Sequence, residues 1–232
     1  MTNARNSLIA GLPLPDQERL LAVCEPVTLV LSEVLCESGT LTTHVFFPTE
    51  GFVSLVSVID QSPGVEVGMI GKEGMLGAQL ALGISVTPLR ALVQGRGAAL
   101  CITTPAFRTL LKHSPALQQS MHRYVYVLMK QLATSSACLR FHMIEPRLAR
   151  WLLMSQDRAE SARFRVTQEF LAYMLGVRRA GITAAAGALQ RSGLINYSRG
   201  DIEVLDRRGL EAAACGCYAA ERTTYDEFLG ER

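Results

Sequence analysis

The chain has 232 residues, of which 49% are hydrophobic and 19% charged, and its formal net charge is +2. This length and apolar content allow one large or two modest packed domains and exclude a disordered chain. No apolar run reaches the roughly 18 residues of a membrane-spanning helix, so no membrane span is expected. The start, MTNARNSLIAGLPLP, has a short apolar piece broken by Gly and Pro, unlike a signal peptide, and predicts a cytoplasmic protein.

The N-terminal half has the pattern of a short helix followed by strands. Residues 15–23, PDQERLLAV, predict a helix with Pro15 near its start. From residue 27 to about 104, short runs rich in Val, Leu, Phe and Thr are interrupted by Gly or Pro at intervals of roughly 8–14 residues, which is typical of a sandwich or barrel-like roll. Within this region GKEGMLGAQLALG does not alternate and predicts a turn and a short helix at about residues 75–82.

After residue 104 the pattern becomes helical. Thr103 or Thr104 can cap a helix that has Pro105 as its first residue, and Ser114 and Pro115 repeat this start signal. The second helix runs to about Phe141 without Gly or Pro, and would be about 40 Å long. It can pack on its own domain or pair with a second copy, and we favour the pair because its apolar residues are spaced like a coiled-coil seam: Leu117, Met121, Tyr124, Leu128, Leu132 and Leu139.

A further helix begins near Pro146, so the break at residues 142–144 is the expected hinge. The sequence therefore predicts an α+β protein in three parts. These are a β-roll domain of the effector-binding type over residues 1–113, a dimerisation helix and hinge over 114–142, and a winged helix-turn-helix over 143–232.

The third part carries the most specific local pattern. Thr167 predicts a helix N-cap, and Gly176 ends that helix because a sharp turn there needs a residue that tolerates positive φ. A second helix is expected over residues 178–192, with these residues inward: Ile182, Ala185, Ala186 and Leu189. Strands at about 194–197 and 202–205 flank the turn SRGD, which predicts a hairpin, or wing, after the second helix.

This region collects positive charge beside small side chains. Arg178 and Arg179 lie where the second helix begins, and in helix-turn-helix proteins that end enters the major groove of DNA. Arginine can bond guanine bidentately or hold a phosphate, and Arg199 at the hairpin tip can reach the DNA backbone. The alternative is that the small residues serve helix packing and the arginines form a solvated face. We favour DNA binding because the turn, the charge and the wing occur together.

The order of β-roll, long helix and winged helix, with VTQEFLAYMLGVRRAGITAAAGALQRSGLI in particular, resembles the CRP/FNR superfamily of bacterial transcription regulators. The resemblance covers residues 12–220 or so. It implies a homodimer that binds a pseudo-palindromic operator in double-stranded DNA, with RNA polymerase as a candidate partner. The residues that match the superfamily motif are Thr167, Leu171, Ala172, Leu175, Gly176, Arg179, Ile182, Leu189, Gly193, Leu194 and Ile195.

The base-reading positions depart from the superfamily pattern. Its Arg-Glu-Thr becomes Arg179-Ala180-Gly181, and its second base-reading arginine falls at Ala184, so only Arg179 carries over as a base reader. We expect Arg178, Arg179 and Thr183 to read or position the DNA. The residues expected to contact its backbone are Thr167, Gln168, Ser198 and Arg199.

The expected effector pocket departs as well. Cyclic-AMP binders of the superfamily carry Gly-Glu-Leu-Gly, and the matching Gly74-Met75-Leu76-Gly77 has a methionine that accepts the ribose hydroxyl poorly. Cyclic AMP is therefore disfavoured, the effector is unknown, and no cofactor is required. The residues proposed for the pocket are Glu73, Gly77 and Arg90.

The cysteines and histidines predict neither a metal site nor an enzyme. Four cysteines are scattered among apolar neighbours and are interpreted as small buried side chains: Cys24, Cys36, Cys101 and Cys138. Cys215 and Cys217 form a lone C-x-C, which is weak support for metal or redox chemistry, since zinc and iron–sulfur sites usually need three or four ligands. No nucleophile–base motif is present. The alternative function is a ligand or redox sensor that acts mainly through protein partners, with little DNA binding.

Overall fold

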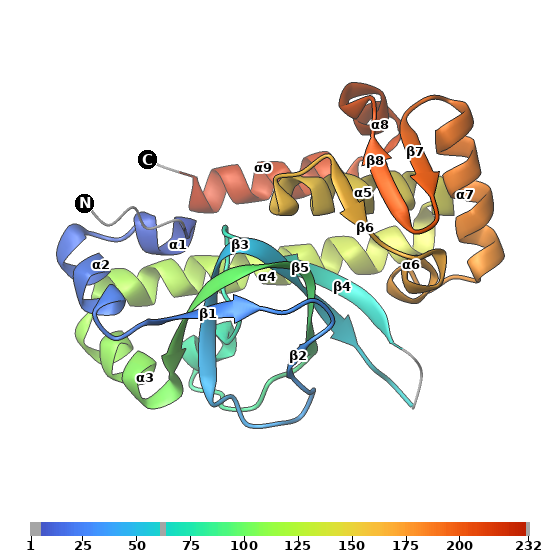
Figure 1. Ribbon diagram of the computed structural model, residues 1–232. Coiled ribbons are helices and arrows are strands. Elements are labelled where there is room, and N and C mark those ends of the chain that lie inside the picture. The colour runs from blue at the N-terminus through green and yellow to red at the C-terminus, as the bar shows by residue number, and fades with distance from the viewer. Residues whose placement is uncertain (1–5, 61–63, 231–232) are drawn as a thin grey trace.

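The computed structural model describes residues 6–60 and 64–230. Its N-terminal part is an antiparallel sheet in the order β1-β5-β3-β4, with β2 also paired to β5 (Figure 1). Two short helices, α1 (Ser7–Ala10) and α2 (Leu14–Leu21), precede the sheet. The strands are β1 (Glu25–Leu29), β2 (Val34–Cys36), β3 (His44–Ser57), β4 (Val65–Ile70) and β5 (Arg90–Thr103).

The two longest strands bend together, and this bend closes the sheet into a roll. The pairing of β3 with β5 shifts register three times between Pro48 and Val53. Gly51 has a φ of +72°, and a Cβ on Gly97 would lie 2.2 Å from the carbonyl oxygen of Glu50. The backbones therefore approach at the bend as only glycine permits. Residues His44–Ser57 therefore form one bent strand, β3, although Pro48 and Gly51 interrupt its apolar residues.

The helix expected at about residues 75–82 is shorter than predicted. The structure has a 3₁₀ helix, η1, only over Ala78–Leu82. Gly77, just before it, has a φ of +102°, which is incompatible with a helix interior. Met75 and Leu76 instead extend along the roll, where Leu76 bridges to Phe46.

The long helix is confirmed as α4 (Pro115–Phe141), which follows α3 (Thr104–His113). The hydroxyl of Ser114 caps it by accepting the N–H of Leu117 at 3.0 Å. In Figure 1 α4 runs the length of the molecule behind the roll, and the final helix α9 (Cys217–Leu229) lies along it.

The predicted seam on α4 is partly wrong. Leu117, Met121 and Tyr124 are at most 2% exposed because they pack into the core of the chain's own roll. The Tyr124 hydroxyl also donates to the carbonyl of Met75 at 3.2 Å. This half of the seam cannot meet a second chain. A long helix that is apolar on two sides has two apolar stripes. The spacing of its apolar residues does not show which stripe packs against the roll and which stays free for a second chain.

The C-terminal part is a helical domain closed by a small sheet. The strands pair in the order β6-β8-β7, and one apolar core joins them to the helices. The expected fold class, a roll with a long helix and a winged helix-turn-helix, is confirmed. Among the described residues, no helix is long and apolar enough to cross a membrane. The remaining elements are α5 (Ile144–Ala159), β6 (Arg163–Arg165), α6 (Gln168–Met174), α7 (Arg179–Arg191), β7 (Ile195–Ser198), β8 (Asp201–Val204) and α8 (Arg207–Ala213).

Candidate nucleic-acid interface

Helices α6 and α7 form the expected helix-turn-helix. The Thr167 hydroxyl accepts the N–H of Phe170 at 3.1 Å and so caps α6. Gly176 follows α6 with a φ of +61°, which lets the chain turn sharply. The four side chains expected to face inward from α7 are all at most 5% exposed: Ile182, Ala185, Ala186 and Leu189. The opposite side of α7 is therefore left for contacts outside the domain.

Strands β7 and β8 form the wing. Ser198 pairs with Asp201, so only Arg199 and Gly200 make the turn. Both have positive φ, +50° and +87°, as a two-residue type I′ hairpin turn requires. The turn lies against the start of α6, because the N–H of Val166 donates to the carbonyl of Gly200 at 2.7 Å. Arg199 is thus exposed at the wing tip, beside the capping residue Thr167.

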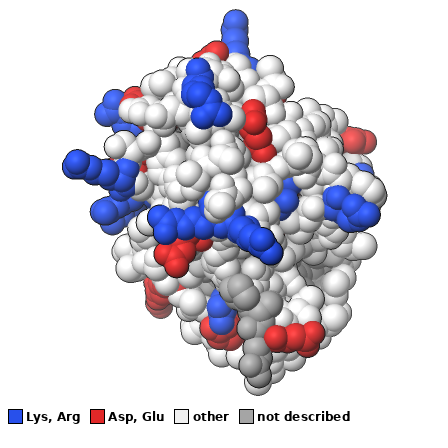
Figure 2. Space-filling model, turned by 90° about the vertical axis from the view of Figure 1, so that its right-hand side faces the viewer, with Lys and Arg blue, Asp and Glu red and all other residues white. Residues whose placement is uncertain are grey.

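The exposed face around α7 is positively charged. Figure 2 looks onto this side of the molecule and shows many Lys and Arg side chains from its top to its middle, with several acidic side chains among them. One of the arginines here, Arg163, forms an ion pair with Glu203 at 2.8 Å. The arginines that the sequence places in this region are all exposed: Arg163, Arg165, Arg178, Arg179, Arg191 and Arg199.

The side chains predicted to contact DNA lie in one continuous strip. The Thr183 hydroxyl on α7 lies 2.6 Å from Oε1 of Gln168 on α6, so the two helices are joined at their exposed edge. Thr167 precedes Gln168 and touches the wing turn, and Arg178 and Arg179 are exposed at the start of α7. Ser198 and Arg199 complete the strip on the wing. Two of these groups also have structural roles, Thr167 as a cap and Gln168 as a hydrogen-bond acceptor.

The small residues of α7 serve two different purposes. A Cβ on Gly181 would lie 2.7 Å from Cδ1 of Ile144, so this glycine allows α7 to pack against the start of α5. The packing interpretation therefore holds at Gly181. Ala180 and Ala184 are exposed, and their short side chains would let another molecule approach the helix closely.

Two buried arginines of α5, which the sequence analysis did not single out, hold the domain together. Arg147 donates a hydrogen bond to the carbonyl of Leu175 at the end of α6, and burial lowers the pKa of Arg147. Arg150 forms an ion pair with Glu221 of α9 and donates to Ser135 of α4 at 3.2 Å. Burial raises the pKa of Glu221, and Arg150 acts in the opposite direction. The only feature of the sequence that could have indicated these buried arginines is the number of arginines in α5.

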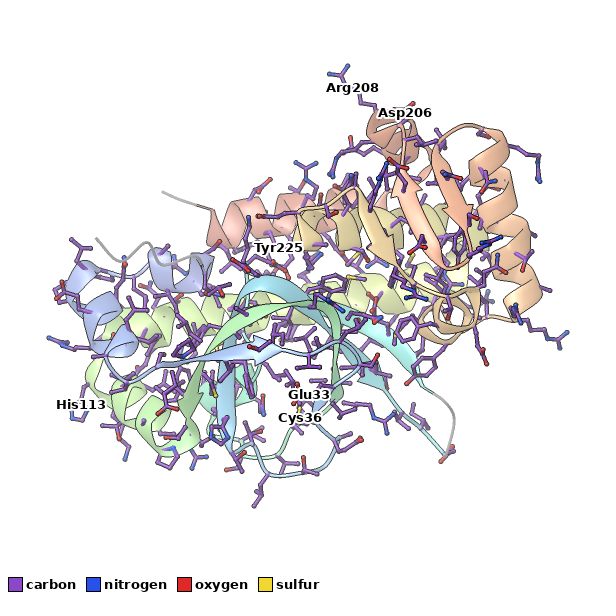
Figure 3. All side chains as sticks on the ribbon, in the orientation of Figure 1. Glu33, Cys36, His113, Asp206, Arg208 and Tyr225 are labelled. Atoms are coloured by element: carbon purple, nitrogen blue, oxygen red, sulfur yellow. The ribbon has the colours of Figure 1, made fainter. Side chains whose placement is uncertain are left out.

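The residues proposed for an effector pocket do not line one common cavity. Glu73 pairs with Arg158 of α5 at 2.8 Å, and Arg90 pairs with Glu37 at 2.8 Å. Gly77 lines two cavities of the roll, of about 110 Å³ and about 160 Å³. Both are smaller than the roughly 300–1,000 Å³ of usual small-molecule pockets. Met75, at the superfamily's glutamate position, is fully buried. Figure 3 labels Glu33 and Cys36 on the roll, below the sheet.

The expectation of no metal-ligand cluster needs correction. Cys138 at the end of α4 lies 3.5 Å from Cys215, and Cys217 lies 3.5 Å from Nδ1 of His142. These four residues form a group that could hold a metal ion. Spacing along the chain hid it, because the two pairs are separated by more than seventy residues. The signal was two short pairs, C-x-x-x-H and C-x-C, which were not considered together.

Comparison with known proteins agrees with this geometry. Residues 146–213 match the family of Crp-like helix-turn-helix domains. The chain carries a Crp-like helix-turn-helix domain. The match supports a DNA-binding domain of the kind found in transcription regulators. A search of curated proteins found no match.

Solved structures share the fold of this chain over most of its length. FixK2 from Bradyrhizobium japonicum is 12% identical, with a TM-score of 0.70 over 83% of this chain and 98% of its own. The c-di-GMP-responsive regulator CLP of Xanthomonas campestris is 16% identical, with a TM-score of 0.67 over 84% of this chain and 100% of its own. A CRP-family regulator from Thermus thermophilus is 18% identical, with a TM-score of 0.66 over 81% of this chain and 96% of its own.

Proposed function

We propose that this chain is a homodimeric, sequence-specific DNA-binding transcription regulator, controlled through its β-roll and acting in the cytoplasm. The Crp-like domain supports DNA binding in general. The observation that carries the proposal further is the continuous exposed strip from Arg178 and Arg179 on α7, through Thr183 and Gln168, to the wing turn.

Within this strip we assign different tasks to different side chains. Arg179, in the first turn of α7, reads a base edge, since arginine can bond guanine O6 and N7 together. Arg178 and Thr183 position the helix in the groove. Thr167, Gln168, Ser198 and Arg199 hold the sugar–phosphate backbone, which fixes the register but carries no sequence information. With Ala180 and Ala184 at the superfamily's other reading positions, we expect an operator unlike that of its founding members.

We further propose that two copies pair through a partly exposed stripe on α4 at the edge of the roll core, which Val125 also contacts. Its residues recur at alternating intervals of three and four, as in a coiled-coil seam: Val125, Met129, Leu132, Ser136 and Leu139. Met129 is 62% exposed, although its side chain is apolar. A two-fold pair would present two α7 helices to half-sites about one helical turn apart in DNA, roughly 34–36 Å.

Control through the roll requires a link between the roll and the winged helix. Arg158 of α5 pairs with Glu73 of the roll, and Arg150 of α5 bonds to both α4 and α9. A signal that binds one arrangement of the roll more tightly than another would move α5, and with it α7. RNA polymerase stays a candidate partner, and the signal is unidentified.

The proposal is tested by selecting bound DNA in vitro and titrating the selected operator by fluorescence anisotropy. We expect Arg179→Ala to lower affinity about 10–100-fold, because one bidentate base contact contributes about 1–3 kcal/mol. Arg208→Ala is the matched control. Arg208 is exposed on α8, projecting from the top of the molecule away from α7 (Figure 3), and should leave affinity unchanged.

The salt dependence tests whether phosphate contacts contribute to binding. Binding should weaken steeply as salt rises, since phosphate contacts release counterions. Equal affinities for wild type and Arg179→Ala would remove Arg179 as a base reader. Recovery of no preferred sequence by the wild type would favour the alternative, a sensor that acts through protein partners.

A further inference from the structure

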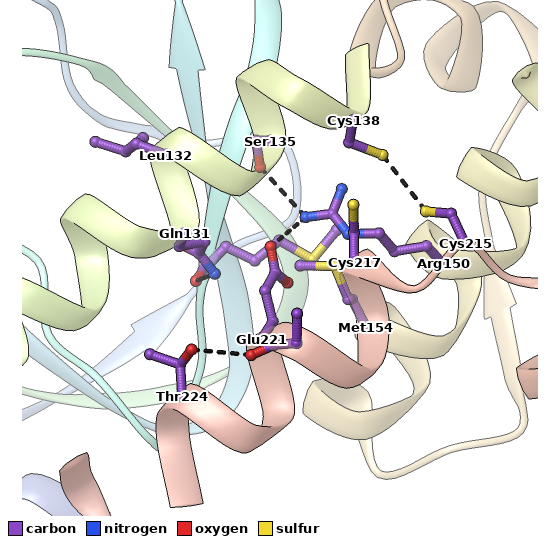
Figure 4. A network of polar contacts seen from close by, with 12 residues as sticks. Gln131, Leu132, Ser135, Cys138, Arg150, Met154, Cys215, Cys217, Glu221 and Thr224 are labelled. Atoms are coloured by element: carbon purple, nitrogen blue, oxygen red, sulfur yellow. Dashed lines mark hydrogen bonds and ion pairs between the residues drawn. The ribbon is translucent and has the colours of Figure 1, made fainter. Parts of the chain in front are cut away.

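Four potential metal ligands meet where α4 ends and α9 begins. Cys138 and His142 lie one helical turn apart at the C-terminal end of α4. Cys215 lies in the connection between α8 and α9, and Cys217, after Gly216, is the first residue of α9. The three thiol sulfurs and a ring nitrogen of His142 all lie within 4.8 Å of one another. Figure 4 shows Cys138 pointing at Cys215, with Cys217 close by at the start of α9.

The distances fit a single tetrahedral ion. A Zn–S bond of about 2.3 Å and a Zn–N bond of about 2.0–2.1 Å place neighbouring ligand atoms about 3.5–3.8 Å apart. The sulfurs of Cys138 and Cys215 are 3.5 Å apart, as are the Cys217 sulfur and Nδ1 of His142. A disulfide would need about 2.05 Å between sulfurs. An iron–sulfur cluster divides its cysteines between two or more irons, so cysteines on different irons lie further apart than the ligands of one ion.

The ligand types select the ion. Three thiolates and one imidazole are the Cys₃His set of structural zinc sites, which are closed by four protein ligands. Soft thiolates disfavour Mg²⁺ and Ca²⁺, which prefer oxygen. Of six cysteines and four histidines in the chain, three cysteines and one histidine meet here.

The surroundings also suit a metal centre. Three thiolates and a neutral imidazole around Zn²⁺ carry a net charge of −1, and the Arg150 guanidinium lies close enough to Cys138 and Cys215 to interact with them electrostatically. Figure 4 shows Arg150 beside these cysteines. Cys138 and Cys215 are buried, whereas Cys217 is half-buried and His142 reaches solvent. The ion can therefore approach from the His142 side and end in a protected position.

The backbone holds the four ligands in place without the ion. The N–H of Cys215 donates to the carbonyl of Pro146 at 3.4 Å, and its carbonyl accepts from the N–H of Tyr218 at 3.1 Å. These bonds tie the C-x-C turn to α5 on one side and to α9 on the other. The His142 N–H donates to the carbonyl of Cys138 at 3.1 Å and so orders the last turn of α4.

We propose that Cys138, His142, Cys215 and Cys217 bind one Zn²⁺ ion in a structural Cys₃His site. On binding, the three thiols release their protons to solvent, and His142 binds through Nδ1 as the neutral ring. The ion closes a loop between Cys138 and Cys215, which are 77 residues apart, and this loop contains α5, α6, α7 and the wing. It therefore clamps both ends of the DNA-binding part to the end of α4. The proposal uses none of the residues assigned to DNA contact.

The first experiment measures bound metal on the full chain. The protein is purified under reducing conditions, and its metal content is determined by mass spectrometry. We expect about one zinc per chain in wild type and in Cys101→Ser, a control in β5 far from the site. Cys217→Ser and His142→Ala should lose the zinc. His142 reaches solvent, so its replacement tests the site even where a buried cysteine variant fails to fold.

The second experiment replaces zinc with Co²⁺, whose tetrahedral thiolate complexes absorb visible light. After chelator treatment, titration with Co²⁺ should give this absorption in wild type and Cys101→Ser. The affinity should fall by at least about 100-fold in His142→Ala, since loss of even an outer hydrogen-bond partner costs about 10–100-fold. Chelator should also lower the melting temperature of wild type but not that of Cys217→Ser.

Several results would overturn the proposal. One is a reduced wild-type protein that contains no metal and shows no Co²⁺ absorption above that of Cys217→Ser. Another is iron with acid-labile sulfide in place of zinc. A Cys138–Cys215 disulfide in the metal-free protein, found by peptide mass spectrometry under the same reducing conditions, would also exclude it. Each result can be read whether or not the chain binds DNA.

Discussion

The Thr183 hydroxyl of α7 and the Gln168 side-chain oxygen of α6 lie 2.6 Å apart on the exposed face of the helix-turn-helix. The same hydroxyl lies 3.1 Å from the carbonyl of Arg179, one turn earlier. Thr183 therefore touches the residue that we assign to base reading and the helix that we assign to phosphate binding. Its hydroxyl can hold α6 and α7 in register when DNA approaches.

Replacing Thr183 with valine keeps the shape of the side chain and removes its hydrogen bonds. We expect DNA affinity to fall about 10-fold, while the free energy of unfolding changes by no more than about 1 kcal/mol, the usual contribution of one exposed hydrogen bond. Anisotropy titrations and urea denaturation measure the two effects. Thr109→Val, which removes a similar bond to the carbonyl of Pro105 on α3, is the control. Equal losses of DNA affinity in both variants would contradict the assigned role.

Replacing Met129 with glutamate should separate the two copies. In the proposed seam the new charges would face each other across the two-fold axis and would have to be buried. We expect wild type to sediment as a dimer and Met129→Glu as a monomer with much weaker operator binding. Leu14→Glu, on α2, introduces the same charge at another exposed apolar residue and should leave the dimer intact. A dimeric Met129→Glu protein would place the interface elsewhere.

Glu221→Gln should destabilise the protein strongly. The buried Arg150 guanidinium would lose its partner charge, and breaking such a pair costs about 3–5 kcal/mol. Urea denaturation gives the change in the free energy of unfolding. Glu211→Gln tests the same substitution at a more exposed pair with Arg207, where about 1 kcal/mol or less is expected. If both variants lost a similar free energy of unfolding, burial of the Arg150–Glu221 pair would not add to its contribution to stability.

Glu66 should make stability depend on pH near neutrality. Burial raises the pKa of Glu66 to about 7, and this is opposed by the hydrogen bond from Ser54, at 2.5 Å, and by Arg150 and Arg158. The folded state then holds the proton between the usual carboxyl range and pH 7, where the unfolded state has lost it. Stability from this group is therefore present at low pH and decreases as the pH rises towards 7.

The test compares wild type with Glu66→Gln from pH 5 to pH 8. We expect the stability of wild type relative to the variant to fall by about 1–3 kcal/mol over this range, measured by urea denaturation at each pH. Glu33→Gln, at the exposed residue labelled on the roll in Figure 3, should not alter the pH dependence. A pH profile that Glu66→Gln leaves unchanged would contradict the role of Glu66.

Much of the winged helix could be predicted because its signals are local. The Thr167 cap and the turn at Gly176 concern only their immediate neighbours in the chain, and the SRGD turn sets the pairing of β7 with β8. The inward side of α7 follows from the periodicity of its apolar residues. For the same reason the residues proposed to contact DNA lie together on the helix-turn-helix and the wing, and their contact with DNA stays a prediction.

Predictions that depended on contacts between distant segments were less successful. Tyr124 has the spacing of a dimer seam, but the roll surrounds it, and its hydroxyl reaches Met75. Glu73, proposed for a ligand pocket, forms an ion pair with Arg158 of α5, a partner that the sequence did not indicate. In each case a partner far along the chain decides the side chain's role, and periodicity does not report that partner.

The sequence by itself determined the order of elements and the positive, helix-turn-helix character of the C-terminal part, because caps, turns and apolar periods act over a few residues. Only the tertiary structure decided which stripe of α4 is covered and which charges are buried. It also decided that Cys138 and His142 meet Cys215 and Cys217. These last relationships arise when packing of the apolar core brings distant segments together, and a metal site depends on separations in space, not along the chain.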